Sequence, residues 1–408
     1  MLLDEQSPKD ALLGRPDFEF LAKTLNFQLL PAIGETESKE TSDALYSINP
    51  RQFVGHFRLP SGRIVLVRPK IPGACVIRML AYVYTNFSGQ AHIREAFQPY
   101  AVAYERDSLL FEPLVQRLNE LVSRRALRGL YQEYIPHEEN LTVLRGAVQV
   151  PRHLQENHSR PDRILCRFHE NTVDNGDNQI VKWTLIHLLS YQDWSAKTVH
   201  LLKTNLHQFQ RVSLRQPRAG TLNRLHYHRL NDDYQPIHAL CKFFLDRMAF
   251  SEKLGVVAFH GFLLDMNKLF EDYVTNAFVR VSRPTRVSAV PQQTGEMSPF
   301  PIDFKPDVIL RCGEVVVGVV DAKYKHVEDK GYSNHDFYQA LAYGTALKTP
   351  RTYLFFPSTE SEYLKKGIVH IHNSPITIDI RLVDLAGAAA SMQLEQEVSA
   401  LIVDLQRS

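Results

Sequence analysis

Two aspartates and one lysine lie at the ends of two neighbouring apolar runs. Asp307 precedes the first run, in KPDVIL, and Asp321 and Lys323 end the second, in VVDAKYK. Successive side chains of a strand point to opposite faces, so Asp321 and Lys323 would share one face. Gly313 favours a tight turn between the runs. A hairpin with its register centred near Glu314 would then place Asp307 opposite Asp321.

Two acids and a lysine in this arrangement suit metal-assisted hydrolysis of a phosphodiester. Two carboxylates that lie close together raise each other's pKa, and a divalent cation removes this repulsion. Mg²⁺ prefers a few carboxylates together with water and a phosphate oxygen, and Mn²⁺ accepts the same ligands. A bound ion lowers the pKa of a water, and a nearby lysine can stabilise the charge of the transition state. The alternative is a strand end with solvated charges and an ordinary turn.

Two predicted helices flank this hairpin. The segment LLDMNKLFEDYVTNAF has a broad apolar face, and Asp265 is well placed to cap its N-terminus. Glu271 lies in the middle of this helix and would either supply a third carboxylate or remain in solvent. Gln339 and Tyr343 share a face of the predicted helix 333–347, where they would support the site, contact DNA or be ordinary surface groups. The order helix, strand, strand, helix predicts an α/β arrangement.

The composition of the chain limits the remaining function classes. A length of 408 residues predicts two or three domains of about 100–200 residues each. The hydrophobic fraction of 44% is typical of folded cores, and the formal net charge of +2 means that any basic surface must be local. The sequence has no CxxC pair, P-loop, signal peptide or apolar run as long as a membrane span. We therefore expect a soluble, cytoplasmic protein.

The rest of the chain divides into β-rich and mixed segments. Residues from about 15 to 100 are β-rich, with a hairpin predicted in GHFRLPSGRIVLVRPK and a helix in IRMLAYVY. A second helix, in SLLFEPLVQRLNELVSRRALRG, would end near Gly129. Short strands and the loop ENTVDNGDNQ precede a third helix, and IHALCKFFLDRMAF predicts a fourth. The window 207–230 holds five arginines and no acid, and would be a solvated face or a surface that contacts phosphate or a partner.

Two histidine pairs have the spacing of metal ligands on a strand. They are His226 and His228 in HYH, and His370 and His372 in HIH. Because no acid or cysteine lies within three residues of either pair, we expect core or surface histidines.

In chain order, these segments resemble the McrC subunit of McrBC-type, modification-dependent (5-methylcytosine) restriction systems. KPDVIL, VVDAKYK and FYQALAY resemble the nuclease core of the PD-(D/E)xK superfamily. The segments that point to the McrC branch are LVRPKIPGACVIRMLAYVY, GLYQEYIPHEENLTVLRG, RFHENTVDNGDNQIVKWTL and LLDMNKLFEDYV. The resemblance runs from about residue 50 to 380. Single motifs are modestly specific, whereas their order and spacing together are specific.

The resemblance implies roles for named residues. Asp307 and Asp321 would bind the metal together with the backbone carbonyl of Ala322. Lys323 would be the catalytic lysine, and Glu271 a further acidic member. The residues that match the Gln-x-x-x-Tyr element of many such nucleases are Gln339 and Tyr343.

The resemblance also implies a partner. McrC-like proteins lack an NTPase of their own and work with a hexameric AAA+ GTPase, McrB, which binds the GTP and recognises modified double-stranded DNA. The N-terminal part would insert into the ring and stimulate GTP hydrolysis, and no membrane is involved. The segment 129–178 is the best candidate for this contact, although an ordinary turn explains its polar loop equally well. The residues that stand out in it are Arg145, Asp174, Asn175 and Asn178.

The expected fold is α/β, with a C-terminal PD-(D/E)xK restriction-endonuclease-like core in which helices flank a mixed sheet. The expected domains are a β-rich domain 1–100, a helical and β partner-binding region 101–235, and a nuclease domain 236–408. Two alternatives remain: a stand-alone nuclease for repair or branched DNA, and a non-catalytic regulator of an AAA+ motor. The long N-terminal half argues against the first, and the intact set of two acids and a lysine argues against the second.

Overall fold

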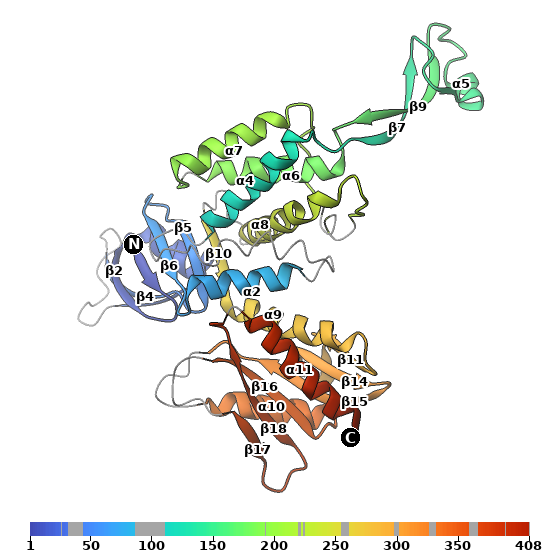
Figure 1. The fold of residues 1–408 in the computed structure, drawn as a ribbon. Helices are drawn as coiled ribbons and strands as arrows, with labels where there is room; N and C mark the ends of the chain where they lie inside the picture. Colours follow the sequence, from blue (N-terminus) through green and yellow to red (C-terminus); the bar gives the residue numbers. More distant parts are fainter. Residues whose placement is uncertain are drawn as a thin grey trace. The chain divides into compact units, whose positions relative to one another are not determined.

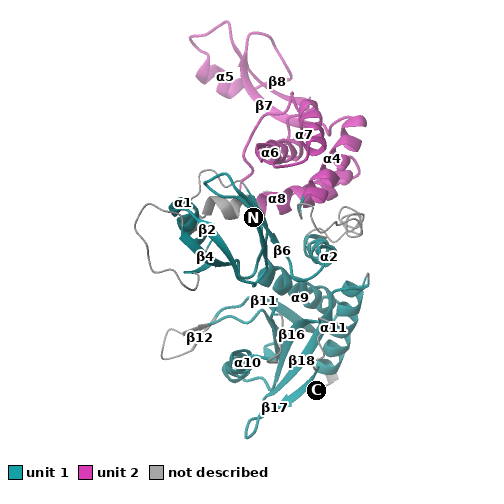
Figure 2. Ribbon diagram, turned by 90° about the vertical axis from the view of Figure 1, so that its left-hand side faces the viewer, with its two compact units in different colours: residues 1–111, 250–408 teal, residues 112–249 magenta. Residues whose placement is uncertain are grey.

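The chain forms two compact units (Figures 1 and 2). The computed structural model describes residues 1–25, 27–31, 44–85, 111–191, 193–218, 222, 225–253, 261–297, 302–325, 332–358, 366–387 and 389–407. Unit 1 comprises residues 1–111 and 250–408, and unit 2 comprises residues 112–249. Unit 2 overlaps the predicted middle region 101–235 and also contains residues 236–249 of the predicted last domain. The predicted domain 1–100 and the rest of the predicted last domain, residues 250–408, are grouped together in unit 1.

The N-terminal part of unit 1 is β-rich, as the sequence predicts. Its strands are β1 (Leu2–Asp4), β2 (Lys9–Leu13), β3 (Gln28–Pro31), β4 (Ala44–Asn49), β5 (Phe53–Arg58) and β6 (Ile64–Arg68). Its helical elements are α1 (Arg15–Glu19), η1 (Phe20–Thr24) and α2 (Gly73–Thr85). The predicted hairpin is confirmed because β5 pairs antiparallel with β6, and α2 confirms the helix predicted after it.

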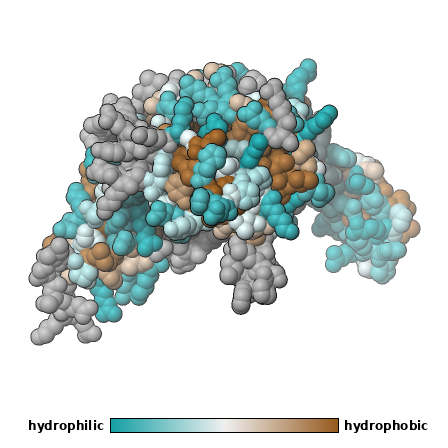
Figure 3. All heavy atoms as spheres, turned by 90° about the horizontal axis from the view of Figure 1, so that it is seen from below, coloured by the Kyte–Doolittle hydropathy of each residue, from teal (hydrophilic) through white to brown (hydrophobic). Residues whose placement is uncertain are grey.

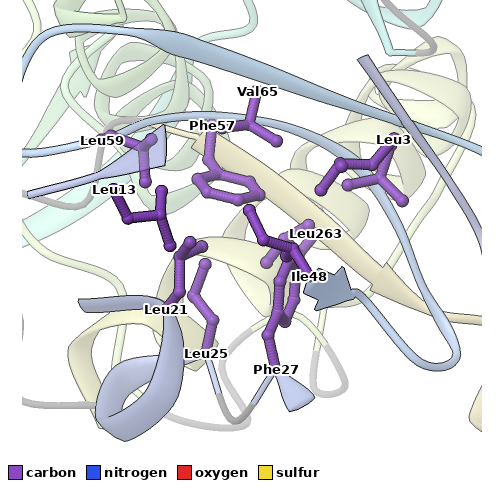
Figure 4. Close-up of a cluster of buried hydrophobic side chains, with 11 residues drawn as sticks. Leu3, Leu13, Leu21, Leu25, Phe27, Ile48, Phe57, Leu59, Val65 and Leu263 are labelled. Carbon is purple, nitrogen blue, oxygen red and sulfur yellow. The ribbon is translucent and has the colours of Figure 1, made fainter. Parts of the chain in front are cut away.

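A strand from the second half of the chain completes the N-terminal sheet. β10 (Gly261–Asp265) pairs antiparallel with β5 in the sheet β1-β6-β5-β10. A Cβ at Gly261 would lie 2.3 Å from the Cβ of Phe57, so this close approach requires glycine. Leu263 of β10 is buried among N-terminal side chains such as Leu3 and Phe57 (Figure 4). This shared core explains why the predicted first and last domains belong to one unit.

The C-terminal part of unit 1 is a mixed sheet between helices. The strand order is β11-β14-β15-β16-β18-β17, with parallel pairing of β15 to β16 and of β16 to β18. Helix α10 packs on one face, and α9 and α11 pack on the other (Figure 2). The strands are β11 (Val287–Pro291), β14 (Val308–Cys312), β15 (Val315–Ala322), β16 (Arg351–Ser358), β17 (Gly367–His370) and β18 (Thr377–Asp384), and β12 (Gly295–Met297) pairs with β13 (Ile302–Phe304). The helices are α9 (Met266–Ser282), α10 (Asn334–Ala346) and α11 (Ala390–Arg407).

The cap and the apolar face predicted for α9 are confirmed. The Asp265 side chain accepts a hydrogen bond from the backbone N–H of Lys268 at 3.1 Å, and Ser333 caps α10. The apolar face of α9 is buried, as expected of an amphipathic helix on a sheet. Its fully buried members include Met266, Leu269, Phe270, Tyr273, Ala277 and Phe278.

Unit 2 combines a group of helices with a long two-stranded arm (Figure 1). The helical elements are α4 (Glu112–Leu127), α5 (Val150–Glu156), α6 (Gly176–Ser190), α7 (Ala196–Gln208), η4 (Asp232–Tyr234) and α8 (Gln235–Lys253). β7 (Glu133–Leu141) pairs antiparallel with β9 (Ile164–Thr172) along its whole length, and β8 (Ala147–Val148) adds to β9. We call residues 133–172 the arm, because they extend away from the helices of this unit.

Polar side chains cover much of the face seen in Figure 3, with apolar side chains gathered in separate patches. Large exposed hydrophobic residues of the C-terminal part belong to four different elements, β15, α10, β17 and α11. They are Val315, Tyr338, Ile368, Met392 and Val403. Within the described ranges, no helix has the length and hydropathy needed to cross a membrane.

Candidate functional site

The hairpin of β14 and β15 brings Asp307 and Asp321 to the same end of the sheet. Val308 pairs with Val320, so the same register continued by one residue places the two aspartates opposite each other. This is the register predicted from the sequence. A bulge shifts the pairing nearer the turn, where Gly313 has a φ of 61° that favours glycine.

The carboxylate of Asp307 is tied to the strand that carries Asp321. Its Oδ2 accepts a hydrogen bond from the backbone N–H of Ala322 at 2.7 Å. Burial, followed by the negative charges of Asp321 and Glu271, raises the pKa of Asp307 to about 8. The raised pKa favours the protonated form of this carboxyl group.

Asp321 and Lys323 form an ion pair in a buried position. The Lys323 Nζ lies 2.6 Å from Asp321 Oδ2, and the Asp321 side chain is only 3% exposed. Burial raises the pKa of Asp321, although the ammonium of Lys323 opposes this change. Burial also disfavours the charged form of Lys323, but Asp321 and Asp307 outweigh it and raise the pKa of the lysine. Lys323 is therefore charged at neutral pH.

Because side chains alternate between the two faces along β15, Asp321 and Lys323 lie on the face of the sheet that α10 covers. Val319, two residues before Asp321, packs with Tyr343 of α10. Burial and the negative charge of Asp321 raise the pKa of Tyr343. The Gln339 amide donates a hydrogen bond of 2.7 Å to the Tyr343 hydroxyl, which in turn donates to the carbonyl of Lys305 at 3.4 Å. The predicted support residues Gln339 and Tyr343 therefore lie beside the acid pair.

Glu271 lies near Asp307, but other side chains bind its carboxylate. Its Oε1 accepts hydrogen bonds from Lys268 Nζ at 2.9 Å and from Gln292 Nε2 at 2.5 Å. The described part of the chain contains no group of three or more His, Cys, Asp or Glu residues arranged to hold a metal ion. A direct role for Glu271 as a further acidic member of the site therefore stays a prediction.

The donor set nevertheless fits one hard divalent cation. Asp307 and Asp321 place two carboxyl groups together where burial favours a proton or a cation. The N–H of Ala322 points toward Asp307, and the carbonyl of a strand residue points to the same side as its N–H. Two carboxylates and this carbonyl form an all-oxygen set of the kind that Mg²⁺ and Mn²⁺ accept.

Three residues around the site were missed by the sequence analysis as site members. Asp336, in the first turn of α10, is 1% exposed and lies 2.6 Å from Lys325 Nζ. Its charge adds to the effects that raise the pKa of Asp321. Gln292 donates its backbone N–H to the carbonyl of Asp307 at 2.9 Å. Lys325 is the last residue of the VVDAKYK segment, two positions after the DxK lysine, but no local sequence signal marks Asp336 or Gln292 as a site residue.

The polar loop ENTVDNGDNQ forms a helix cap in unit 2. The Asn175 side chain accepts a hydrogen bond from the N–H of Asn178 at 3.1 Å, and both amides donate to the carbonyl of Tyr131. Asp174 accepts hydrogen bonds from Gln179 and from Ser213. Asn175 thus caps α6, and Asp174 and Asn178 bind other groups of unit 2. A role of these residues in the contact with a partner stays a prediction.

The remaining candidates belong to the surface. Arg145 of the arm lies 4.0 Å above the Phe168 ring and 3.6 Å from Glu170. His228 contacts the Tyr131 hydroxyl at 3.1 Å. All four histidines of the two pairs are exposed, and none belongs to a metal-binding group within the described ranges. The basic window 207–230 includes positions outside the described residues, and nothing tests its role.

Comparisons with known proteins agree with the family predicted from the sequence. The model of the family "McrBC 5-methylcytosine restriction system component" matches residues 48–357. A relative from Escherichia coli (strain K12), the type IV methyl-directed restriction enzyme EcoKMcrBC, is 22% identical over 303 residues, which cover 69% of this chain and 83% of the relative.

Two solved structures are also similar. A half-complex from a tetradecameric assembly of Thermococcus gammatolerans McrB AAA+ hexamers with bound McrC has a TM-score of 0.62 and 19% identity, covering 98% of this chain and 99% of that chain. The Thermococcus gammatolerans McrBC complex has a TM-score of 0.45 and 20% identity over 69% of this chain and 87% of that chain. The first likeness supports the same fold over nearly the whole chain. Because the family match also spans well over half of the sequence, the chain belongs to the family of McrBC 5-methylcytosine restriction system components.

Proposed function

We propose that this chain is the nuclease component of a GTP-dependent, modification-dependent restriction complex and hydrolyses phosphodiester bonds of double-stranded DNA. The observation that carries the proposal is the meeting of Asp307, Asp321 and Lys323 at one sheet end in a chain of this family. The mixed sheet between α9 and α10 supports the assignment of a PD-(D/E)xK core to this region.

The chain's own residues would divide the chemical work as follows. Asp307, Asp321 and the Ala322 carbonyl would hold Mg²⁺, or Mn²⁺, and Asp307 must release its proton when the site is loaded. The bound ion would polarise the phosphate and lower the pKa of a water. Lys323 supplies a fixed positive charge that stabilises the charge developing on the phosphate oxygens. Tyr343 and Gln339 hold the neighbouring surface of α10 in place.

The partner that suits this family is a hexameric AAA+ GTPase, which would bind the GTP. The similar solved complex contains McrB AAA+ hexamers with bound McrC. The arm lies within the segment 129–178 that the sequence favours for the contact with the ring. It exposes large apolar side chains, which is the kind of surface that protein contacts bury. They are Tyr134, Val143, Leu144, Val150 and Leu154.

The test combines this chain with its AAA+ partner, methylated plasmid, GTP and Mg²⁺. Wild type is compared with Asp321→Ala, and Glu314→Ala serves as the control because the exposed Glu314 lies in the turn of the same hairpin, between β14 and β15. Wild type and Glu314→Ala should cut both strands, whereas Asp321→Ala should not. All three should stimulate GTP hydrolysis equally, because none of them changes the arm.

Other outcomes select the alternatives. If all three proteins stimulate GTP hydrolysis and none cuts methylated, unmethylated or branched DNA, the chain is a regulator of the motor. If wild type cuts branched DNA without GTP or partner, it is a stand-alone nuclease.

A further inference from the structure

Gln292 connects two acidic residues of the candidate site through two different groups. It directly follows β11, on the edge strand beside β14. Its backbone N–H donates to the carbonyl of Asp307 at 2.9 Å, and its side-chain Nε2 donates to Glu271 Oε1 at 2.5 Å. One residue therefore bonds to both the β14 end and helix α9.

The backbone of Gln292 adopts a conformation that is unfavourable for a residue with a Cβ atom. Its φ is 49°, in the left-handed region. Pro291 pairs with Val308, so Gln292 stands opposite Asp307 where the ladder ends. The chain leaves the sheet at this left-handed residue, while the Gln292 N–H still donates to the carbonyl of Asp307. Such conformations persist where the surrounding structure holds them, and they are frequent at functional sites.

The backbone bond alone does not require glutamine at this position. Any residue except proline could donate the same N–H, and glycine adopts this φ more readily. What glutamine adds is a neutral amide donor that reaches Glu271. Lys268 binds the same Oε1 at 2.9 Å, so the Glu271 carboxylate is held between the two donors. A neutral donor also leaves the charge around Asp307 unchanged, whereas a second carboxylate would increase the repulsion.

We propose that Gln292 is a positioning residue, which fixes Glu271 against Asp307 and so sets the affinity of the acid pair for a divalent cation. The inference rests on the proposed nuclease function and adds to it a residue that acts through Glu271 and Asp307. Loss of an outer partner of this kind typically lowers metal affinity or activity by about 10–100-fold.

The experiment separates the side chain from the backbone of Gln292. Gln292→Gly removes the amide and relieves the left-handed backbone, and Gln292→Ala removes the amide and keeps the strain. Gln293→Ala is the matched control, because the exposed Gln293 binds Arg311 at 3.3 Å, away from the acids. For each full-length protein, Mn²⁺ binding is measured by calorimetry, the melting temperature without metal, and plasmid cutting with the AAA+ partner.

We expect both Gln292 variants to lose Mn²⁺ affinity and cutting by about 10–100-fold. The glycine variant should melt at or above the wild-type temperature, so its loss cannot be attributed to unfolding. Gln293→Ala should match wild type in all three measurements. Wild-type Mn²⁺ affinity and cutting in Gln292→Gly would overturn the inference, because the backbone conformation alone would then suffice.

Asp307→Asn tests the underlying function in the same series. If wild type does not cut, or if Asp307→Asn cuts as wild type does, the nuclease proposal fails. The Mn²⁺ affinities of the Gln292 variants then still decide whether this residue positions a cation site. If wild type binds no Mn²⁺, both the inference and the metal site fail.

Discussion

Two buried carboxyl groups with raised pKa values lie at the end of β15, one on each side of the strand. The two groups have different partners. On the side of α10, Asp307 stands with Asp321 and Lys323, and its pKa is about 8. On the other side, the Tyr324 hydroxyl donates to Glu5 at 3.3 Å. Glu5 is completely buried, and burial raises its pKa to about 8 as well.

The difference lies in the groups that contact each acid, because the charges of Lys70 and Asp265 also act on Glu5. Glu5 accepts hydrogen bonds from two uncharged donors, the Tyr324 hydroxyl and the backbone N–H of Lys70. A protonated acid suits that place, because a neutral carboxyl group satisfies neutral donors at a low desolvation cost. Asp307 instead faces a second carboxyl group, with a charged lysine beside it. A raised pKa therefore occurs in two settings, a packed acid on one side and the proposed cation site on the other.

Asp307→Asn should produce the largest loss of function. It removes a proposed metal ligand, and we expect cutting of methylated plasmid to fall by about 10³-fold or more, which corresponds to several kcal/mol. The melting temperature should stay level or rise at pH 8.5. The folded-state pKa is raised, so the unfolding free energy falls as pH rises toward 8, and asparagine does not share this loss. Near wild-type cutting by Asp307→Asn would show that Asp307, like Glu5, takes no part in cutting.

Glu5→Gln should change stability and leave cutting intact. The pKa of Glu5 is 4.5 in its reference state and about 8 in the folded chain, so its stabilising protonation is fully present below pH 4.5 and is lost as pH rises through 8. Between these values each pH unit costs the wild type up to roughly 1.4 kcal/mol of unfolding free energy. Urea unfolding at pH 5 and pH 8.5 should therefore show a gain for Glu5→Gln at the higher pH alone. An equal gain at both pH values would mean that Glu5 is ionised in the folded chain.

Tyr343→Phe should have an intermediate effect on the α10 side. The variant loses the hydroxyl that accepts from Gln339 at 2.7 Å, and we expect about 10-fold slower cutting and a stability loss of about 1 kcal/mol. Adding Gln339→Ala should cost little more, because the two side chains share one hydrogen bond. Tyr338→Phe is the control, since this tyrosine of the same helix is 69% exposed. Additive losses in the double variant would show that Gln339 acts independently of Tyr343.

Local patterns predicted those parts of the site that neighbouring residues determine. The alternation of β15, the register of its hairpin with β14 and the cap at Asp265 all depend on residues close in sequence, and all are confirmed. The spacing of Gln339 and Tyr343 likewise placed both on one helix face. Helical and strand periodicity suffices for such features.

Contacts between distant segments could not be predicted in this way. The pairing of β10 with β5 joins residues about 200 positions apart and merges the two predicted domains in one unit. Glu5 and Tyr324 are 319 residues apart, and nothing in either local sequence marks their contact. The left-handed backbone of Gln292 is held by its tertiary setting and has no glycine or turn motif to announce it.

Tyr324→Phe should have the smallest effect and gives the sharpest test of the comparison. The hydrogen bond to Glu5 is long, at 3.3 Å, so its loss should cost about 1 kcal/mol or less of unfolding free energy. The phenyl ring can keep its packing against Phe270, so Lys323 on the opposite face should not move, and cutting should change less than about 2-fold. A 10-fold loss of cutting at an unchanged melting temperature would mean that the Glu5 contact positions Lys323 through the strand. The two sides of β15 would then be one functional unit, and Glu5 would belong to the site despite its neutral partners.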